Sequence, residues 1–258
     1  MKAKKHLGQH FLTNKHYALR IADQAISTDP TGNLLEIGPG QGFLTQYLLE
    51  KDVHLKMVEF DHDMVDHLKS HFALEENQII LNDFLKLNLE ELFMGEPFSV
   101  VGNFPYNISS QIVFKILSHR EKIPAFSGMF QKEVAQRLAS QHGTKTYGIL
   151  SVLLQAFYDV SLVFNISPGN FNPPPKVDSS VIQCIRKEQP LITEHVKMFF
   201  SIVKMAFNQR RKMLRNSLKS VIPKDDHSDE LSAFLTRRPE QMSVKDFITL
   251  TNRIKQET

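Results

Sequence analysis

A glycine-rich turn directly after a short apolar segment restricts the fold of this chain more than any other feature. Residues 33–37, Asn-Leu-Leu-Glu-Ile, have the length and apolar content of a buried strand, and Gly38, Gly40 and Gly42 follow. Glycines at such a turn let the backbone bend tightly and approach a ligand at the edge of a sheet. We therefore expect a strand, a ligand-binding turn and a helix that reaches Glu50.

Strands and helices alternate along the chain as far as about residue 140. We expect further strands at 53–59, 78–81, 98–101 and 125–130, and helices at 15–26, 61–72 and 111–117. Alternation at this spacing predicts an α/β fold in which helices cover both faces of a parallel sheet.

The pattern changes in the second half of the chain. A helix is expected at 149–157, and two strands at 160–166 and 176–185 are joined across Pro173-Pro174-Pro175. Helical spacing then appears at 193–207, 209–221, 228–236 and 243–255, the last opened by the capping box Ser243-x-x-Asp246. We place one boundary near 187, which separates an α/β domain over 1–187 from a small helical domain over 188–258.

Positive charge is concentrated in two segments, although the net charge is only +3. Residues 1–20 carry five basic and no acidic side chains, and residues 195–223 carry seven basic and none acidic. Such clustering attracts a polyanion such as RNA; the alternative is a solvated helix face.

The composition argues against several classes of protein. No apolar run approaches the ~18 residues of a spanning helix, and no apolar segment follows the basic start as in a secretion signal. The single Cys184 lies in an apolar, strand-like run, where a buried thiol is expected. One cysteine allows neither an internal disulfide nor a multi-cysteine zinc site, which favours a cytoplasmic protein without metal or membrane.

Two carboxylates near the glycine-rich turn distinguish the cofactors that it could bind. Glu59, 21 residues after Gly38, can accept both ribose hydroxyl protons of an adenosine-containing cofactor. A dinucleotide site favours G-x-G-x-x-G, whereas the spacing here is G-x-G-x-G and Glu36 precedes it. A carboxylate is unfavourable beside pyrophosphate and suits a ligand with an ammonium and a sulfonium. A plain strand-to-helix turn is the alternative.

Asp83 follows the third expected strand. Its side chain can accept a hydrogen bond from the amino group of the cofactor adenine. The alternative is a helix N-cap for residues 84–92.

Residues 103–106, Asn-Phe-Pro-Tyr, follow the fourth expected strand and therefore lie at the same edge of the sheet. An exocyclic adenine amine is a poor nucleophile, and two acceptors on its N–H bonds would orient the lone pair toward a methyl group. The Asn103 side-chain oxygen and the Pro105 carbonyl can serve as these acceptors, and Tyr106 can stack on the base. Taken alone, the segment could equally be an ordinary turn.

Several motifs together resemble the ribosomal RNA adenine N6-dimethyltransferase family, in its bacterial small-subunit branch. They are Leu-Gly-Gln-His-Phe-Leu at 7–12 and the segments 36–42, 102–109, 131–134, 171–179 and 206–212. The resemblance implies a Rossmann-like methyltransferase domain that uses S-adenosylmethionine and releases S-adenosylhomocysteine, followed by a small all-helical RNA-binding domain. It further implies a monomer that dimethylates two adjacent adenosines near the 3′ end of 16S rRNA during assembly of the small ribosomal subunit.

The resemblance also implies roles for individual residues. It places the cofactor against His10, Leu12, Gly38, Glu59, Asp83 and Asn103. It places the target base on Asn103, Pro105 and Tyr106, with Phe171 on its other face; a core aromatic is the alternative for Phe171. It places rRNA phosphates against Arg210, Arg211, Lys212 and Arg215.

Three positions depart from the family pattern. His10 stands where Asn is expected, so a hydrogen bond to the cofactor remains available and pH sensitivity is added. Phe104 replaces Leu, which we expect to change packing only. Ile149 replaces an Arg, which puts one RNA or structural contact in doubt.

Three other functions are weighed against this one. A nicotinamide-dependent dehydrogenase would share the turn and Glu59, but it leaves residues 103–106 unexplained. An RNA-binding assembly factor with a dead active site would show degraded motifs at 36–42 or 103–106, and neither segment does. A large-subunit antibiotic-resistance methyltransferase is disfavoured by the segments 173–179 and 208–212.

Overall fold

The computed structural model describes residues 3–4, 7–222 and 228–256, and the chain divides into two compact units. The first unit comprises Met1–Ala135 and Val160–Arg186, and the second comprises Gln136–Asp159 and Lys187–Thr258. We expected one boundary at 187; the chain also passes between the units at 135 and 159, so residues 136–159 join the helical part. Lys2 and Lys5 of the basic N-terminal segment lie outside the described residues.

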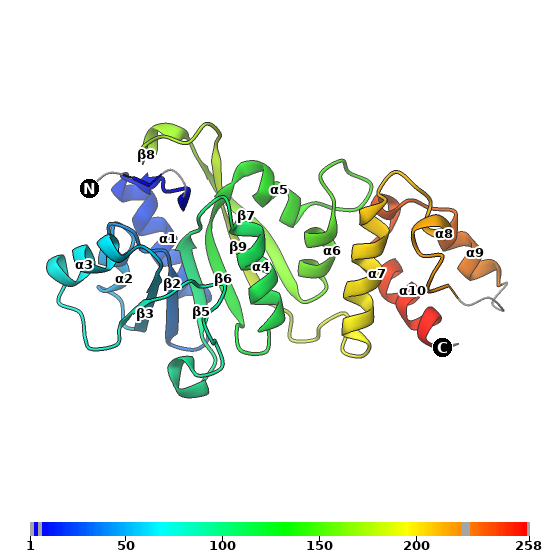
Figure 1. Cartoon of the computed structure of the whole chain (residues 1–258), viewed down its shortest axis with the longest axis horizontal. Helices are drawn as coiled ribbons and strands as arrows, with labels where there is room; N and C mark the ends of the chain where they lie inside the picture. Colours follow the sequence, from blue (N-terminus) through cyan, green and yellow to red (C-terminus); the bar gives the residue numbers. More distant parts are fainter. Residues whose placement is uncertain (1–2, 5–6, 223–227, 257–258) are drawn as a thin grey trace. The chain divides into compact units, whose positions relative to one another are not determined.

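A seven-stranded sheet forms the centre of the first unit, in the order β4-β3-β2-β5-β6-β9-β7 (Figure 1). The strands are β2 (Asn33–Ile37), β3 (His54–Glu59), β4 (Ile79–Leu81), β5 (Ser99–Asn103), β6 (Ala125–Gln131), β7 (Tyr158–Ile166) and β9 (Ser179–Arg186). The pairs from β4 to β6 are parallel and β9 runs antiparallel to β6, which confirms the expected parallel sheet and adds an antiparallel end.

The helices of this part are α1 (Lys15–Thr28), α2 (Thr45–Leu48), α3 (His62–His71), α4 (Ser109–Ser118) and α5 (Lys132–Ala139), the last of which we did not expect. The chain passes from β2 to its neighbour β3 toward one edge of the sheet, and from β5 to its neighbour β6 toward the other edge. Right-handed crossovers therefore place α2 and α4 on opposite faces. The direction reverses between β2 and β5, and open α/β sheets bind ligands at this point.

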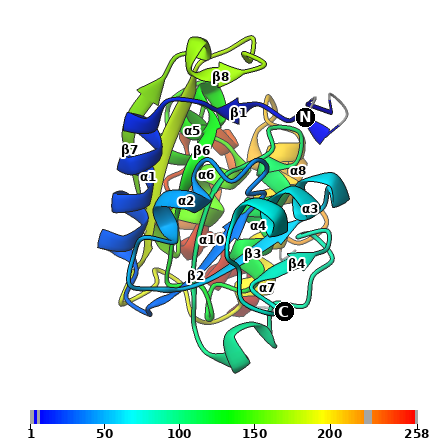
Figure 2. The same ribbon diagram turned by 90° about the vertical axis from the view of Figure 1, so that its left-hand side faces the viewer.

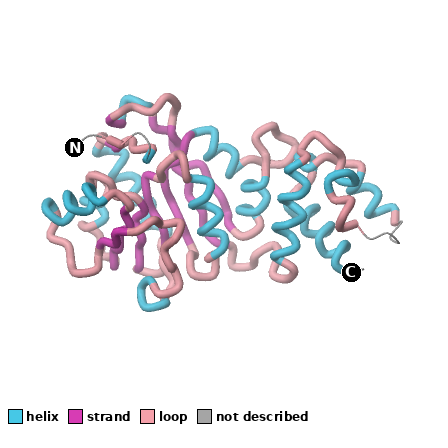
Figure 3. Tube along the Cα trace, viewed as in Figure 1, coloured by secondary structure: helices cyan, strands magenta, loops and turns pink. Residues whose placement is uncertain are grey.

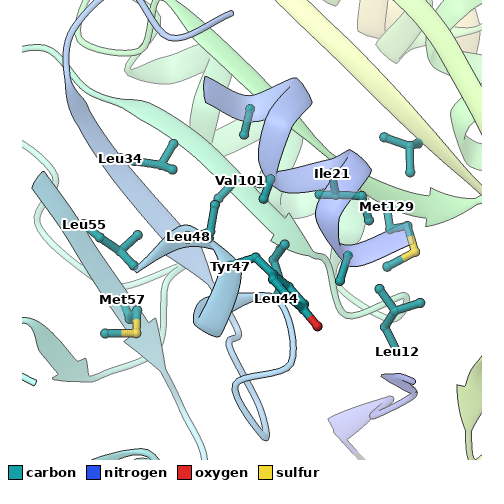
Figure 4. Close-up of a cluster of buried hydrophobic side chains, with 14 of the residues drawn as sticks. Leu12, Ile21, Leu34, Leu44, Tyr47, Leu48, Leu55, Met57, Val101 and Met129 are labelled. Atoms are coloured by element: carbon teal, nitrogen blue, oxygen red, sulfur yellow. The ribbon is translucent and has the colours of Figure 1, made fainter. Parts of the chain in front are cut away.

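Apolar side chains on the two faces of the sheet make its core. Figure 4 shows the cluster beneath α1 and α2, which includes Ile21, Leu48 and Val101. Phe104 is fully buried, and its ring packs on Phe130 with centroids 4.9 Å apart. A Cβ at Gly128 would lie 2.6 Å from this ring, so the glycine makes room for it. Phenylalanine at 104 is thus a packing residue.

A two-stranded ladder that the sequence did not reveal attaches the N-terminal segment. β1 (Phe11–Leu12) pairs antiparallel with β8 (Phe171–Asn172), just after the short turn η3 (Pro168–Asn170), and the two lie side by side in Figure 2. The Thr13 N–H also donates to the Asn170 carbonyl at 2.9 Å. These bonds fix where His10 and its neighbours enter the site.

The second unit is helical beyond residue 187, where Figure 3 shows only helix and loop in the described residues. Its helices are α6 (Ile149–Gln155), α7 (Val196–Asn208), α8 (Leu214–Ser217), α9 (Asp229–Leu235) and α10 (Val244–Gln256), with a 3-10 turn η4 (Pro239–Gln241). In its core the Phe207 ring contacts the rings of Tyr147 and Phe247. The capping box of α10 is confirmed, since the Asp246 N–H donates to Ser243 Oγ and the Ser243 N–H to Asp246 Oδ2.

The helix expected over 209–221 is wrong. The backbone leaves α7 at Gln209 (φ −119°, ψ 47°), and the Leu214 N–H donates to the Arg237 carbonyl instead of a helical partner. Only the one-turn α8 follows, so Arg210, Arg211 and Lys212 lie on a turn. In the described part of the chain, no helix is long and apolar enough to cross a membrane.

Candidate functional site

A cavity of about 220 Å³ opens at the carboxyl ends of β2 to β5, where the direction of the sheet reverses. Its lining is formed by residues 7–11, 37–38, 40, 58–60, 82–85 and 103–108. Seven of the nine residues expected at the cofactor and the base lie here: His10, Gly38, Glu59, Asp83, Asn103, Pro105 and Tyr106. Leu12 and Phe171 do not line it.

The glycine-rich turn and the segment 103–106 lie against each other. Gly38 has φ +65°, which side chains rarely adopt, and a Cβ there would lie 3.8 Å from the Pro105 ring. The Gly38 N–H donates to the Val58 carbonyl at 2.9 Å. A ligand on the turn and a base at Pro105 would therefore share one cavity. We call the part near Gly38, Glu59 and Asp83 the cofactor end, and the part near Asn103 to Tyr106 the base end.

Glu59 at the cofactor end is buried, and its carboxylate accepts three backbone hydrogen bonds. Oε2 accepts from the Gly40 N–H at 3.0 Å, and Oε1 accepts from the Phe60 and Asp61 N–H groups at 2.8 Å each. Burial raises its pKa, and the three backbone bonds oppose that shift. A carboxylate has about four acceptor positions, so one on Oε2 remains for a ribose hydroxyl.

Glu36 is a second buried carboxyl, 1% exposed, on the strand that leads into the turn. Thr45 of α2 donates to its Oε2 at 2.8 Å, and Oε2 is the only oxygen of Glu36 with a partner among the described residues. Burial raises its pKa to about 8, with a smaller contribution from Glu59. Glu36 lines a smaller cavity beside the first, with Gly38 and Asn103 shared between the two.

Asp83 lines the cavity and also organises the turn that follows it. Its Oδ1 accepts from the Leu85 N–H at 2.9 Å, and its carbonyl accepts from the Lys86 and Leu87 N–H groups. The alternative for Asp83, an N-cap of a helix over 84–92, is not what forms: residues 83–87 make a turn. Oδ2 remains available to a ligand.

Asn103, the last residue of β5, has its amide orientation set by a backbone carbonyl. Its Nδ2 donates to the His10 carbonyl at 2.8 Å. Because a carbonyl only accepts, this bond requires the amide nitrogen on that side and leaves Oδ1 as an acceptor without a partner in the described residues. The side-chain oxygen is the group that we expected to accept from an adenine amine.

Pro105 and Tyr106 complete the base end. The Pro105 carbonyl accepts from the Ile108 N–H at 3.2 Å, which leaves its second lone pair open. The Tyr106 hydroxyl shares a 2.5 Å hydrogen bond with Ser179 Oγ, and Ser179 is fully buried in β9. Burial raises the Tyr106 pKa, which keeps the hydroxyl neutral.

His10 stacks on Tyr106, with ring centroids 5.5 Å apart and planes inclined by 27°. Its Nδ1 lies 2.8 Å from the Pro173 carbonyl. That carbonyl accepts, so Nδ1 carries the proton and Nε2 is the acceptor of the neutral ring. The prolines after Phe171 thus orient His10.

Polar contacts that we did not expect hold the N-terminal segment near the cavity. Lys4 Nζ lies 2.6 Å from Asp61 and 2.7 Å from Asp63, and Gln9 Nε2 donates to Asp61 at 2.9 Å. Burial opposes ionisation of Asp61, but the bonds from Lys4 and Gln9 outweigh it and lower its pKa. The contacts link residues more than fifty positions apart, so local spacing carries no sign of them.

Two of the expected residues lie outside the lining of the larger cavity. Phe171 is 4% exposed and packs in the hydrophobic cluster beside Leu12, its partner in the β1–β8 ladder. Its ring therefore packs beneath the N-terminal strand and does not face the cavity. This placement agrees with the alternative given above for Phe171, an aromatic residue of the core. Leu12 is 5% exposed and lines the smaller cavity together with Glu36, Gly38 and Asn103, so its contact with a cofactor stays a prediction.

The four basic residues of the second unit that we expected at rRNA phosphates differ in their exposure and contacts. Arg210 is half-buried, and its guanidinium donates to the carbonyls of Thr144 and Lys145, the latter at 2.7 Å. Arg211, Lys212 and Arg215 are exposed. The three exposed side chains are thus accessible to a polyanion, whereas one guanidinium nitrogen of Arg210 already binds a loop; contact of all four with phosphate stays a prediction.

Comparisons with known proteins agree with this geometry. Residues 1–256 match the family described as Ribosomal RNA adenine dimethylase. Ribosomal RNA small subunit methyltransferase A of Flavobacterium johnsoniae is 50% identical over 99% of this chain and 97% of its own length. The protein of the same name from Bacteroides thetaiotaomicron is also 50% identical, over 99% of this chain and 95% of its own length.

Two solved structures are similar in fold. A dimethyladenosine transferase from Plasmodium falciparum is 26% identical and superposes with a TM-score of 0.79, covering 96% of this chain and 98% of its own. The 23S rRNA methyltransferase ErmE has a TM-score of 0.70 at 24% identity, covering 95% of this chain and 100% of its own. The second likeness supports the fold alone.

Proposed function

The chain belongs to the ribosomal RNA adenine dimethylase family, and from this premise we propose that it transfers methyl groups from S-adenosylmethionine to two adjacent adenosines near the 3′ end of 16S rRNA. Each N6 amine would receive two methyls during assembly of the small ribosomal subunit, which places the reaction in the cytoplasm. The proposal extends the family's activity, rRNA adenine methylation, to a particular site.

The open acceptor at Asn103 is the observation that supports this function best. Its Nδ2 is already bonded to the His10 carbonyl, so Oδ1 is oriented before any base arrives. With the open lone pair of the Pro105 carbonyl, it would draw on both N–H bonds of an adenine amine and direct the nitrogen lone pair at the methyl group. The rate would come from positioning and fixed dipoles, without a general base.

The cofactor end fits S-adenosylmethionine, which supplies an electrophilic methyl group when bound. The open position on Glu59 Oε2 would accept a ribose hydroxyl, and Asp83 Oδ2 would accept from the adenine amino group. Glu36 lies beside a small cavity and has one oxygen without a partner among the described residues, so a cationic ligand there would favour its ionised form. A pyrophosphate would meet two buried carboxyls here, which disfavours a nicotinamide cofactor.

Unmethylated small subunits, incubated with the full chain and labelled S-adenosylmethionine, test the proposal. We expect label only in dimethyladenosine at two adjacent positions near the 3′ end of 16S rRNA. Large subunits serve as the control, because label in 23S rRNA instead would assign the chain to the large-subunit branch. Tight NADH binding without S-adenosylmethionine binding would overturn the proposal altogether.

The exposed cations Arg211, Lys212 and Arg215 are proposed to meet rRNA phosphates. Replacing all three by Gln should weaken binding to the small subunit and lower the slope of log K against log salt by about 2–3, because each phosphate contact contributes roughly 0.7–0.9. Filter binding at several salt concentrations measures the slope. The matched control is Arg210→Gln, which should change the slope less. An unchanged slope in the triple variant would mean that this turn is merely solvated.

A further inference from the structure

A lysine on the helix after the base end reaches across to the cofactor end. α4 begins at Ser109 and carries Lys115 in its last turn. Lys115 Nζ donates to the Phe84 carbonyl at 2.6 Å and to the Leu87 carbonyl at 2.5 Å. Both carbonyls belong to the turn 83–87, in which Asp83, Phe84 and Leu85 line the cavity.

The turn 83–87 depends on this lysine because two of its backbone carbonyls, those of Phe84 and Leu87, receive no hydrogen bond from within the turn. Its N–H groups at 85, 86 and 87 all bond to Asp83, through the side chain or the carbonyl. Among the described residues, the carbonyls of Phe84 and Leu87 have Lys115 as their only hydrogen-bond donor. A charged donor makes the stronger kind of hydrogen bond.

The surroundings of Lys115 favour a fixed position. Its ammonium lies 5.2 Å from the centroid of the Phe84 ring, and Phe84 is only 4% exposed. Burial lowers the Lys115 pKa, and the nearby Asp83 carboxylate opposes that shift. The cation therefore attracts the Asp83 side chain as well as the two carbonyls.

We propose that Lys115 is a positioning residue for the cofactor adenine: it holds the turn 83–87 so that Asp83 meets the adenine amino group, and it links that turn to the helix behind Asn103. The inference rests on the proposed cofactor, and it concerns how the cofactor is recognised, not how the methyl group is transferred. It predicts an effect on affinity and on adenine selectivity, with little effect on the chemical step.

Lys122 provides a matched control. Its Nζ donates to the Gly95 carbonyl and lies 3.8 Å from Glu90, so it too binds a loop backbone with its charge. Gly95 precedes β5, at the opposite edge of the sheet from the cavity. Lys122→Met removes the same chemical group from a loop that lines neither of the two cavities described above.

Binding of S-adenosylhomocysteine and of S-inosylhomocysteine to the full chain, measured by calorimetry, tests the role. The inosine analogue has a carbonyl in place of the adenine amine. Lys115→Met should weaken S-adenosylhomocysteine binding by about tenfold and bring the two affinities closer together, whereas Lys122→Met should leave their ratio unchanged. Lys115→Arg keeps the charge and donors and should restore the affinity to within about threefold.

Methylation kinetics complete the test. Lys115→Met should raise the KM for S-adenosylmethionine by about tenfold and keep kcat within about twofold of wild type. An unchanged affinity ratio, or equal losses in Lys115→Met and Lys122→Met, would overturn the proposal. If the wild-type chain binds S-adenosylhomocysteine selectively but does not methylate small subunits, the proposed rRNA substrate is wrong while the role of Lys115 stands.

Discussion

The two ends of the cavity use their hydrogen-bonding groups in opposite ways. At the cofactor end the carboxylates already accept bonds from the backbone: Glu59 accepts three N–H groups and Asp83 accepts one. At the base end the donor is occupied instead, because Asn103 Nδ2 bonds to the His10 carbonyl and Oδ1 stays open.

The difference separates two tasks. A carboxylate that also holds three backbone groups shapes the cofactor end, so changing it alters the fold and the affinity together. An amide whose donor is occupied presents one oriented acceptor, so changing it removes an interaction made with the reacting amine. We therefore expect variants of the base end to change turnover and variants of the cofactor end to change affinity or stability.

The largest expected effect is on turnover. Asn103→Ala removes the acceptor with the smallest change to the cavity wall, and the single-turnover rate of methyl transfer should fall about 10²–10³-fold. Small-subunit binding should stay within about threefold of wild type, measured by filter binding. If turnover is unchanged, the amide is not an acceptor for the base.

A pH-dependent stability should mark the cofactor end. The Glu36 pKa is raised from 4.5 to about 8 in the folded chain. The folded state then holds more protons than the unfolded state between these values, so stability falls as pH rises from about 5 to 8. Glu36→Gln should remove this dependence and gain stability relative to wild type as pH rises, by up to about 4 kcal/mol at pH 8.

Urea unfolding at pH 5, 6.5 and 8 measures the effect. A wild-type chain whose unfolding free energy relative to Glu36→Gln does not change with pH would show that Glu36 ionises normally. Thr45→Val serves as the control, since it removes the hydrogen bond to Glu36 and leaves the carboxyl in place.

A smaller effect is expected on cofactor affinity. Glu59→Gln keeps Oε1 for the Phe60 and Asp61 N–H groups but turns an amide NH₂ toward the Gly40 N–H. The Kd of S-adenosylhomocysteine should rise about tenfold, and kcat at saturating cofactor should stay within a few-fold. A loss confined to kcat would mean that the two ends do not divide the tasks in this way.

Much of this arrangement followed from the sequence because it depends on parallel strands. Residues 33–37 form β2 as expected, and groups after β2, β3, β4 and β5 meet at one edge whatever their distance along the chain. The capping box at Ser243 was equally local. Periodicity and turn chemistry are sufficient for features of this kind.

The errors arose where distant segments decide the outcome. Phe171 lies in the core because β8 pairs with β1 across more than 150 residues, and no local pattern shows this. The bonds from Arg210 to two carbonyls near residue 145 are equally non-local, and its contact with RNA stays a prediction. Lys115 lay in an ordinary helical pattern, and only the folded chain shows which backbone it bonds.

A structure of the full chain with S-adenosylhomocysteine and adenosine tests the division of the cavity most directly. We expect the adenosine N6 amine within about 3.2 Å of Asn103 Oδ1 and of the Pro105 carbonyl, with the cofactor ribose at Glu59. An adenosine bound elsewhere, or one whose amine points away from Asn103, would contradict the account.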